Sequence, residues 1–228
     1  MPESVAIYQP RYYPRLHYLA RASQSDVFVL LDDVEFSRRS RQHRAELSLG
    51  SQQWLTIPVK HENDDVLLTE AEIDTSSRFA EKHYGTLQHK YGSDAEILKP
   101  FYEGVDDRQV LRLVEITVPT LLEMFDRFDV DTEVVRSSEL DVDRPRDASE
   151  YLARLVDAVG GSTYISGETG YENYLEEEPF ERRDLDVAVQ QWTPEWEDGN
   201  VCCLEVLFES SSPREHVEAN PNPSIRHG

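Results

Sequence analysis

Cysteine and long apolar runs are both scarce in this sequence. Its two cysteines, Cys202 and Cys203, are adjacent, which excludes a disulfide framework and a zinc site built on spaced cysteines. No run of about eighteen apolar residues occurs, so no segment is long and apolar enough for a transmembrane helix. The first residues lead straight into a strand-like stretch, so we expect no secretory signal and a cytoplasmic protein.

Positive charge is also in short supply. The 228 residues include 45 acids against 23 bases, of which only four are lysine, and the net charge is −22. A chain of this charge repels nucleic acid and anionic membranes, so we expect no nucleic-acid partner. At about 1 M salt the Debye length is only about 3 Å, which screens such self-repulsion. The composition therefore resembles that of cytosolic proteins from halophiles.

The N-terminal quarter departs from this acidic composition. Residues 1–60 hold eight bases and six acids, so this segment alone carries a positive charge. Arg38, Arg39, Arg41 and Arg44 lie within seven positions, with His43 among them. Arginine presents a planar fork of donors that fits phosphate and carboxylate. The cluster indicates an anion site, or alternatively a solvated edge whose arginines pair with nearby acids.

Apolar runs and turn residues predict an α/β fold. Strand-like runs over 5–8 and 27–31, joined by a short helix from Pro14, form a β-α-β unit. Further strands are expected over 66–73, 134–135, 163–167 and 185–190, helices over 77–91, 94–103, 107–128, 147–159 and 171–175, a helix or strand over 203–208, and a hairpin over 42–59. The sequence thus predicts one α/β domain over 1–209, with a mainly parallel sheet flanked by helices and an inserted β-hairpin, and a mobile tail over 210–228.

Two segments carry a family resemblance. Residues 7–14 read Ile-Tyr-Gln-Pro-Arg-Tyr-Tyr-Pro, and residues 26–39 read Asp-Val-Phe-Val-Leu-Leu-Asp-Asp-Val-Glu-Phe-Ser-Arg-Arg. With later pieces at 42–44, 54–59, 137–140, 164–167 and 174–175, they resemble the WbqC-like family over about residues 4–209. Residues 15–19 (Arg-Leu-His-Tyr-Leu), Ala45 and residues 201–205 depart from the family's usual residues.

The resemblance implies a functional setting. Members of the family occur among genes for O-antigen and other surface polysaccharides. A glycyl, aminoacyl or other acyl transfer to a sugar is suggested for them. The resemblance therefore implies a setting in surface-glycan synthesis more than a particular reaction, and the leading hypothesis is a transferase that acts on a nucleotide-linked or activated sugar.

Polar residues at strand ends are the first candidate site residues, because ligands of β-α-β units gather at the carboxyl ends of strands. Gln9 follows the first strand and would hold a ligand amide or hydroxyl, or pin the following loop. Asp32 and Asp33 follow the second. On a strand they point opposite ways, so one of them would act as general base, bind a sugar hydroxyl or hold a metal with phosphate. The alternative is a turn, a helix cap or a salt bridge.

Other candidates come from later turns and from the aromatic loop. Ser137 and Ser138, and then Ser166 and Gly167, follow short strands and would hold phosphate or sugar oxygens, or simply form turns. Tyr12 would stack on a sugar or base, or pack in the core. His43 is a possible general base with no identified nucleophile. His17, near the start of a helix, resembles at fold level the phosphate-contacting histidines of nucleotidyltransferases.

These observations lead to one leading hypothesis. A transferase of surface-glycan synthesis would use Asp32 and His43 in catalysis and would bind a small sugar or phosphate-bearing substrate. The binding residues would be Gln9, Tyr12, Asp33, Arg38, Arg39, Arg44, Ser137, Ser138, Ser166 and Gly167. A non-catalytic binding or scaffold protein of a glycan pathway and a nucleotidyltransferase-like enzyme stay open as alternatives. The sequence identifies no metal site, no cofactor and no oligomeric state.

Overall fold

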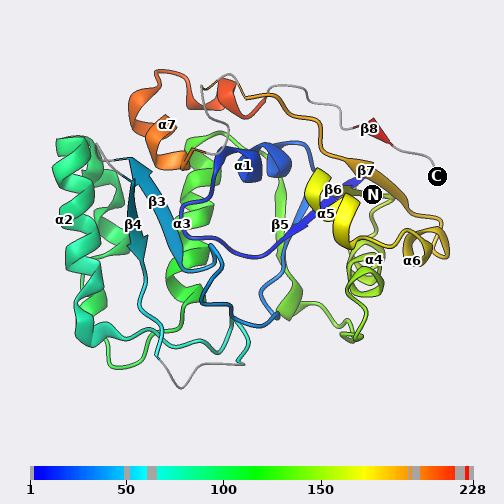
Figure 1. Ribbon diagram of the computed structural model, residues 1–228, viewed down its shortest axis with the longest axis horizontal. Helices are drawn as coiled ribbons and strands as arrows, with labels where there is room; N and C mark the ends of the chain where they lie inside the picture. The colour runs from blue at the N-terminus through cyan, green and yellow to red at the C-terminus, as the bar shows by residue number, and fades with distance from the viewer. Residues whose placement is uncertain are drawn as a thin grey trace.

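A central sheet organises the structure, a computed structural model that describes residues 3–48, 52–60, 66–194, 196, 201–218 and 224–225. Within these ranges the sheet has six strands in the order β5-β2-β1-β6-β7-β8 (Figure 1). The strands that run parallel are β1 (Ser4–Tyr8), β2 (Val27–Leu30), β5 (Glu133–Arg136), β6 (Thr163–Ser166) and β7 (Asp186–Val189). The short β8 (Ser224–Ile225) pairs antiparallel with β7.

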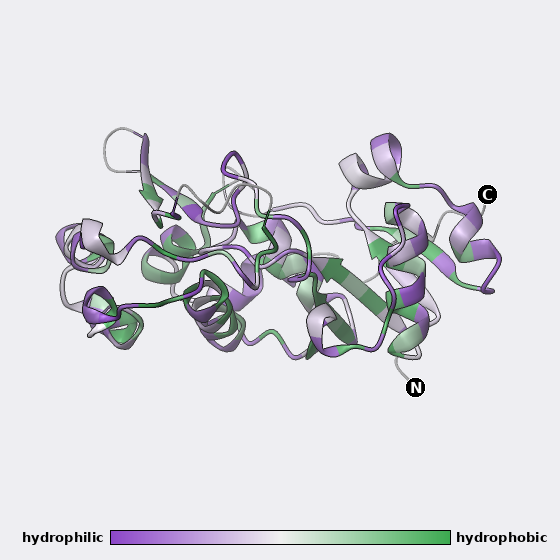
Figure 2. Ribbon diagram, turned by 90° about the horizontal axis from the view of Figure 1, so that it is seen from below, coloured by the Kyte–Doolittle hydropathy of each residue, from purple (hydrophilic) through white to green (hydrophobic). Residues whose placement is uncertain are grey.

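Both faces of this sheet are covered by helices, because alternate strand residues point to opposite sides. Val5 and Ile7 of β1 pack into the cluster that contains α4 (Ala148–Ala158) and Phe180 of α6 (Glu178–Glu181). Ala6 points the other way, into the larger cluster built with α1 (Leu16–Ser23), α3 (Val114–Arg127) and α7 (Cys203–Glu209). The apolar strands run between helices with polar outer faces (Figure 2).

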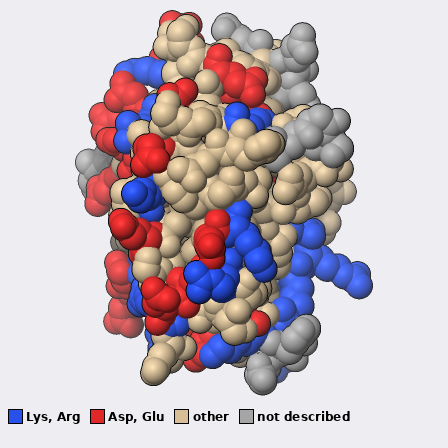
Figure 3. Space-filling view, turned by 90° about the vertical axis from the view of Figure 1, so that its left-hand side faces the viewer, with Lys and Arg blue, Asp and Glu red and all other residues tan. Residues whose placement is uncertain are grey.

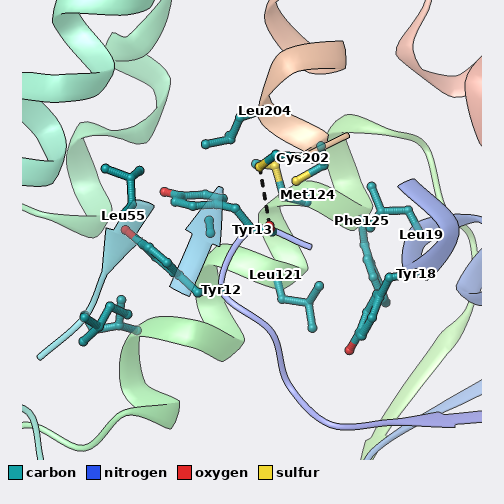
Figure 4. Packing of buried hydrophobic residues seen from close by; sticks show 14 of the residues in the cluster. Tyr12, Tyr13, Tyr18, Leu19, Leu55, Leu121, Met124, Phe125, Cys202 and Leu204 are labelled. Carbon is teal, nitrogen blue, oxygen red and sulfur yellow. Dashed lines mark hydrogen bonds between the residues drawn. The ribbon is translucent and has the colours of Figure 1, made fainter. Parts of the chain in front are cut away.

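A separate hairpin extends the larger cluster. It consists of β3 (Arg44–Ser48) and β4 (Gln52–Thr56), which pair antiparallel, and it lies beside α2 (Phe79–Tyr91) (Figure 1). Ala45, Leu47 and Leu55 turn their side chains into the core. Figure 4 shows Leu55 near the rings of Tyr12 and Tyr13 in this core. The predicted architecture, a mainly parallel sheet flanked by helices with an inserted hairpin, is confirmed.

Three predicted elements differ from the structure. Residues 66–73 form isolated bridges instead of a strand, and residues 92–101 form a 3-10 helix that replaces the predicted α-helix. The helix expected over 107–128 begins only at Val114. Its first residues are held by the preceding loop: Ile73 N–H donates to the Leu111 carbonyl and Leu113 N–H to the Ala71 carbonyl. These bonds draw 111–113 into an extended pairing that sequence periodicity does not reveal.

Charge on the surface is mixed. On the face that carries α2, acidic and basic side chains are interleaved around an uncharged area (Figure 3). No helix in the described ranges is both long enough and apolar enough to cross a membrane. Of the predicted mobile tail, residues 213–216 form a 3-10 helix and 224–225 form β8, while 219–223 and 226–228 lie outside the described residues. The mobility of the tail stays a prediction.

Candidate functional site

The strand order creates a crevice between β1 and β6. Numbered along the chain, the parallel strands stand in the order 3-2-1-4-5, so the connections from β1 and β6 leave in opposite directions. In open α/β sheets ligands bind at such a switch point, beyond the carboxyl ends of the strands. A pocket of about 640 Å³ lies there. Its lining includes residues that follow β1, β6 and β7, namely Gln9, Arg11, Gly167, Glu168 and Gln190.

Two arginines line this pocket. Arg21, on α1, is only 8% exposed, and its Nε donates to Gln190 Oε1 at 3.0 Å. Arg11 donates from Nη2 to the Tyr8 hydroxyl at 2.8 Å. Both guanidinium groups stand over the Tyr8 ring, with their central carbons 4.4 Å (Arg11) and 4.9 Å (Arg21) from its centroid. The tyrosine ring and the glutamine therefore hold two positive charges at the switch point.

Neither arginine has a carboxylate partner among the described residues. Burial lowers the pKa of Arg11. A buried cation without a counter-ion costs several kcal/mol of desolvation, by order of magnitude. In a chain with 45 acids, a carboxylate partner would be easy to supply. The unpaired charges therefore indicate that an anionic ligand completes the site.

His17 shares the pocket with these arginines. Burial, followed by the charges of Arg11 and Arg21, lowers the pKa of His17 to about 3. The imidazole is therefore neutral at physiological pH, and it lies one helical turn before Arg21 on the same face of α1. A neutral histidine offers a hydrogen bond to a ligand without adding to the charge, and a pKa this low makes it a weak base.

Gly167 leaves room for the Arg21 side chain. A Cβ atom at this position would overlap the guanidinium group of Arg21, with Nη2 as the closest atom. The backbone of Gly167 is extended, so any residue could adopt its conformation. Glycine is thus required here for the close approach of the arginine.

Replacing Gly167 with alanine is expected to push Arg21 out of the pocket while the fold persists. The guanidinium group is the flexible end of a side chain, so it moves at little cost, and anion affinity falls about tenfold or more. Gly85→Ala, on α2, is the control, because no atom lies within 4 Å of its added Cβ and the residue does not line the pocket. Calorimetric titration with pyrophosphate measures both variants. Equal affinities in the two variants would contradict this role of Gly167.

Asp32 lies in a second polar cluster, at the carboxyl ends of β2 and β5. It is fully buried, and its oxygens accept from Arg136 Nε at 2.6 Å, Ser138 N at 3.0 Å and Ser138 Oγ at 3.0 Å. Ser137 Oγ lies 3.2 Å from Asp32 Oδ1 and also donates to Asp33, whose other oxygen accepts from the Tyr151 hydroxyl. The structure thus brings together four predicted residues, but they bond to one another and do not line the pocket.

The arginine-rich segment bonds to backbone carbonyls. Arg38 donates to the Val59 and Lys60 carbonyls at 3.0 and 2.6 Å, and Arg44 donates to those of Ser40 and Arg39 at 3.1 and 2.6 Å. Both ring nitrogens of His43 also face carbonyls, of Ile57 at 2.9 Å and of Arg38 at 3.0 Å. The Arg39 side chain is exposed. None of these four predicted residues lines the switch-point pocket.

The segment nevertheless adjoins the pocket. Gln42 Nε2 donates to Gln9 Oε1 at 2.9 Å, which ties the segment to the end of β1. Arg41 is close enough to contribute to the lowered pKa of His17. The segment therefore adds positive potential and holds Gln9 in place.

Tyr12 belongs to a buried hydroxyl network. Its hydroxyl lies 3.1 Å from His83 Nδ1 and bonds to the Tyr102 hydroxyl, which lies 2.9 Å from that of Tyr13. Tyr12 is 1% exposed, and Figure 4 shows its ring inside the core beside Tyr13. Burial raises the pKa of Tyr12 and lowers that of His83 to about 4. Tyr12 therefore packs in the core, which is the alternative to stacking on a ligand.

His83 is expected to make stability depend on pH. Its folded pKa of about 4 lies below the ordinary value of 6.5, so the unfolded chain binds more protons between these values. The free energy of unfolding should therefore fall as pH drops from 6.5 towards 4, by up to about 1.4 kcal/mol per pH unit from this group. His83→Gln should lessen that slope in denaturant unfolding, and His89→Gln, at an exposed site on the same helix, should not. A slope unchanged by His83→Gln would contradict the assignment.

Of the predicted residues, the structure places Gln9, Ser166 and Gly167 in the pocket. Sequence reasoning missed Arg11, Arg21 and Gln190. A signal for Arg21 was present: it interrupts the apolar run Leu19-Ala20-Arg21-Ala22 on a helix whose apolar face is clear. No group of three or more His, Cys, Asp or Glu in the described part of the chain is placed to hold a metal ion.

The chain was compared with known proteins. The model of the WbqC-like protein family matches residues 9–201. The "Uncharacterized protein Rv1507c" of Mycobacterium tuberculosis (strain ATCC 25618 / H37Rv) is 22% identical over 193 residues, which cover 82% of this chain and 81% of the relative. No solved structure matches significantly. Because the family model covers most of the sequence, the chain belongs to the WbqC-like protein family.

Proposed function

We propose that the protein is a transferase that binds a phosphate-bearing, activated sugar in the switch-point pocket, in the synthesis of surface polysaccharide. The observation that carries this proposal is the pair Arg11 and Arg21, two cations with no carboxylate partner among the described residues of an acidic chain. Their forked donors suit a diphosphate. Membership of the WbqC-like family supports the polysaccharide setting.

In such a transfer the residues of the pocket would have different roles. Arg11 and Arg21 would hold the phosphate of the activated sugar, which keeps its bonds while an acyl group passes from its donor to a hydroxyl or amine of that sugar and the donor's carrier leaves. Glu168 is the one carboxylate among the described lining residues, and it would take the proton from an attacking hydroxyl or amine of the acceptor. Gln190 positions Arg21, since it accepts from Arg21 Nε and donates to the His17 carbonyl at 3.1 Å.

Thermal unfolding in 1 M KCl with a ligand panel tests the proposal. The panel holds pyrophosphate, nucleoside diphosphates, nucleotide sugars, sugar phosphates and acyl-coenzyme donors. A ligand that binds the folded state raises the Tm, by an amount that grows with its concentration. We expect a shift with the phosphate-bearing sugars that Arg11→Gln removes. Arg127→Gln, at a surface pair with Glu123, should keep the shift. If no phosphate-bearing ligand shifts the Tm, the proposal is wrong.

A non-catalytic binding protein is the second candidate, because the pocket contains cations that bind a ligand and only one carboxylate. Glu168→Gln separates the two candidates. In a transferase this variant should keep the Tm shift and lose most turnover, by about a hundredfold or more. In a binding protein, wild type itself transfers no group to any acceptor, so Glu168→Gln has no turnover to lose.

A nucleotidyltransferase-like enzyme is favoured by one further observation. His17 lies in the pocket at the start of α1, in a sheet whose parallel strand order 3-2-1-4-5 matches the first five strands of the nucleotide-binding order 3-2-1-4-5-6. This candidate requires a nucleoside triphosphate and magnesium, and it releases pyrophosphate when a sugar phosphate attacks the α-phosphate. Detection of released pyrophosphate distinguishes it from transfer of an acyl group.

A further inference from the structure

The mouth of the switch-point pocket carries aromatic rings as well as cations. Tyr174, the last residue of α5 (Glu168–Tyr174), lines the pocket and is 79% exposed. It is the most exposed of the large apolar side chains in the described ranges. Within those ranges its ring and hydroxyl have no hydrogen-bond, cation or ring partner. An aromatic face is thus presented to solvent at a site where a ligand enters.

Other lining residues of the pocket are apolar. Trp192 is half-buried, and its indole N–H donates to the His216 carbonyl at 3.3 Å, which fixes the ring. Leu152 and Leu31 also line the pocket. The lining therefore combines two cations, Arg11 and Arg21, with aromatic and apolar side chains.

We propose that the pocket takes a nucleoside diphosphate, whose base stacks on Tyr174 while its phosphates bind Arg11 and Arg21. This inference rests on the anion site of the proposed function and adds the base as a second recognised group. Every base has a π-face, and stacking on an aromatic side chain contributes about 1–3 kcal/mol. The parallel strand order matches the first five strands of the nucleotide-binding order 3-2-1-4-5-6, which favours a nucleobase over a sugar ring as the stacked group.

Calorimetric titration in 1 M KCl tests the inference with four probes: ADP, UDP, ribose 5-phosphate and pyrophosphate. Tyr174→Ala should raise the Kd for ADP and UDP by about fivefold to 150-fold, because the stacking contribution is lost. It should leave the Kd for ribose 5-phosphate and pyrophosphate within about twofold, because these probes have no base. Tyr174→Phe keeps the aromatic face and should bind all four probes as wild type does.

Two controls make the outcomes distinct. Asn173→Ala changes the neighbouring exposed residue of α5 and should alter no affinity. If Tyr174→Ala leaves ADP and UDP binding unchanged, or weakens ribose 5-phosphate as much as the nucleotides, the stacking inference is overturned and the anion site stands. If wild type does not bind pyrophosphate, the anion site itself fails, whatever the Tyr174 variants do.

Discussion

Arg21→Met is expected to weaken anion binding by about ten- to 150-fold without destabilising the protein by more than about 1 kcal/mol. Loss of a hydrogen bond to a charged group costs about 1.5–3 kcal/mol of binding free energy. The same guanidinium is buried without a carboxylate partner, so its removal relieves a desolvation cost, while the methionine fills part of the space. The free energy of unfolding should therefore stay within about 1 kcal/mol of wild type or increase.

This combination separates a binding residue from a structural one. Pyrophosphate affinity is measured by calorimetry, and the free energy of unfolding by denaturant titration without ligand. Arg127→Met is the control: it removes a surface arginine whose Nε lies 2.8 Å from Glu123, and it should change neither quantity by much. If Arg21→Met destabilises the protein and binds pyrophosphate like wild type, Arg21 serves the fold alone.

Asp32→Ala is expected to destabilise the protein by about 3 kcal/mol. Its carboxylate is fully buried and pairs with Arg136, whose side chain is 32% exposed. Breaking a buried ion pair costs about 3–5 kcal/mol, and the lower end applies because water reaches the arginine. For a chain of this size the loss corresponds to a fall in Tm of about 6–12 °C.

The control for Asp32→Ala uses the same arginine. Glu139 lies 3.6 Å from Arg136 Nη1 and its side chain is 64% exposed, so Glu139→Ala should cost less than about 1 kcal/mol. Thermal unfolding compares the two variants. The catalytic role that the sequence suggests for Asp32 makes the opposite forecast: turnover is lost and the Tm is kept. Equal Tm values for Asp32→Ala and Glu139→Ala would therefore count against the structural role.

Local patterns were sufficient for the parallel strands and the hairpin, but not for residues 66–73, which form isolated bridges. The apolar runs at 5–8 and 27–31 predict parallel strands, because both faces of such strands are buried. In the structure, core clusters cover both faces of these two strands. A second rule places ligands at the carboxyl ends of parallel strands, and Gln9, at the end of β1, lies in the pocket. These inferences need only residues near one another in the sequence.

The pocket itself depends on contacts between distant segments. Arg21 becomes a pocket residue because Gly167 leaves room for its guanidinium and Gln190 binds it, and these positions are more than a hundred residues away. Asp32 follows an apolar strand, so the sequence predicts that its carboxylate lies at the end of that strand. Whether such a carboxylate faces a ligand or an arginine of β5 depends on which strand becomes its neighbour, and a single sequence does not reveal that pairing.

An arginine-lined pocket inside a molecule of net charge −22 has a kinetic consequence. At a distance an anionic ligand meets the repulsion of the whole molecule, and only near the crevice does it meet the attraction of the two guanidinium groups. Added salt screens the long-range repulsion more than the contacts inside the partly buried crevice. Association should therefore become faster as ionic strength rises, the reverse of ordinary electrostatic steering, so that potassium chloride acts as an accelerator of ligand capture.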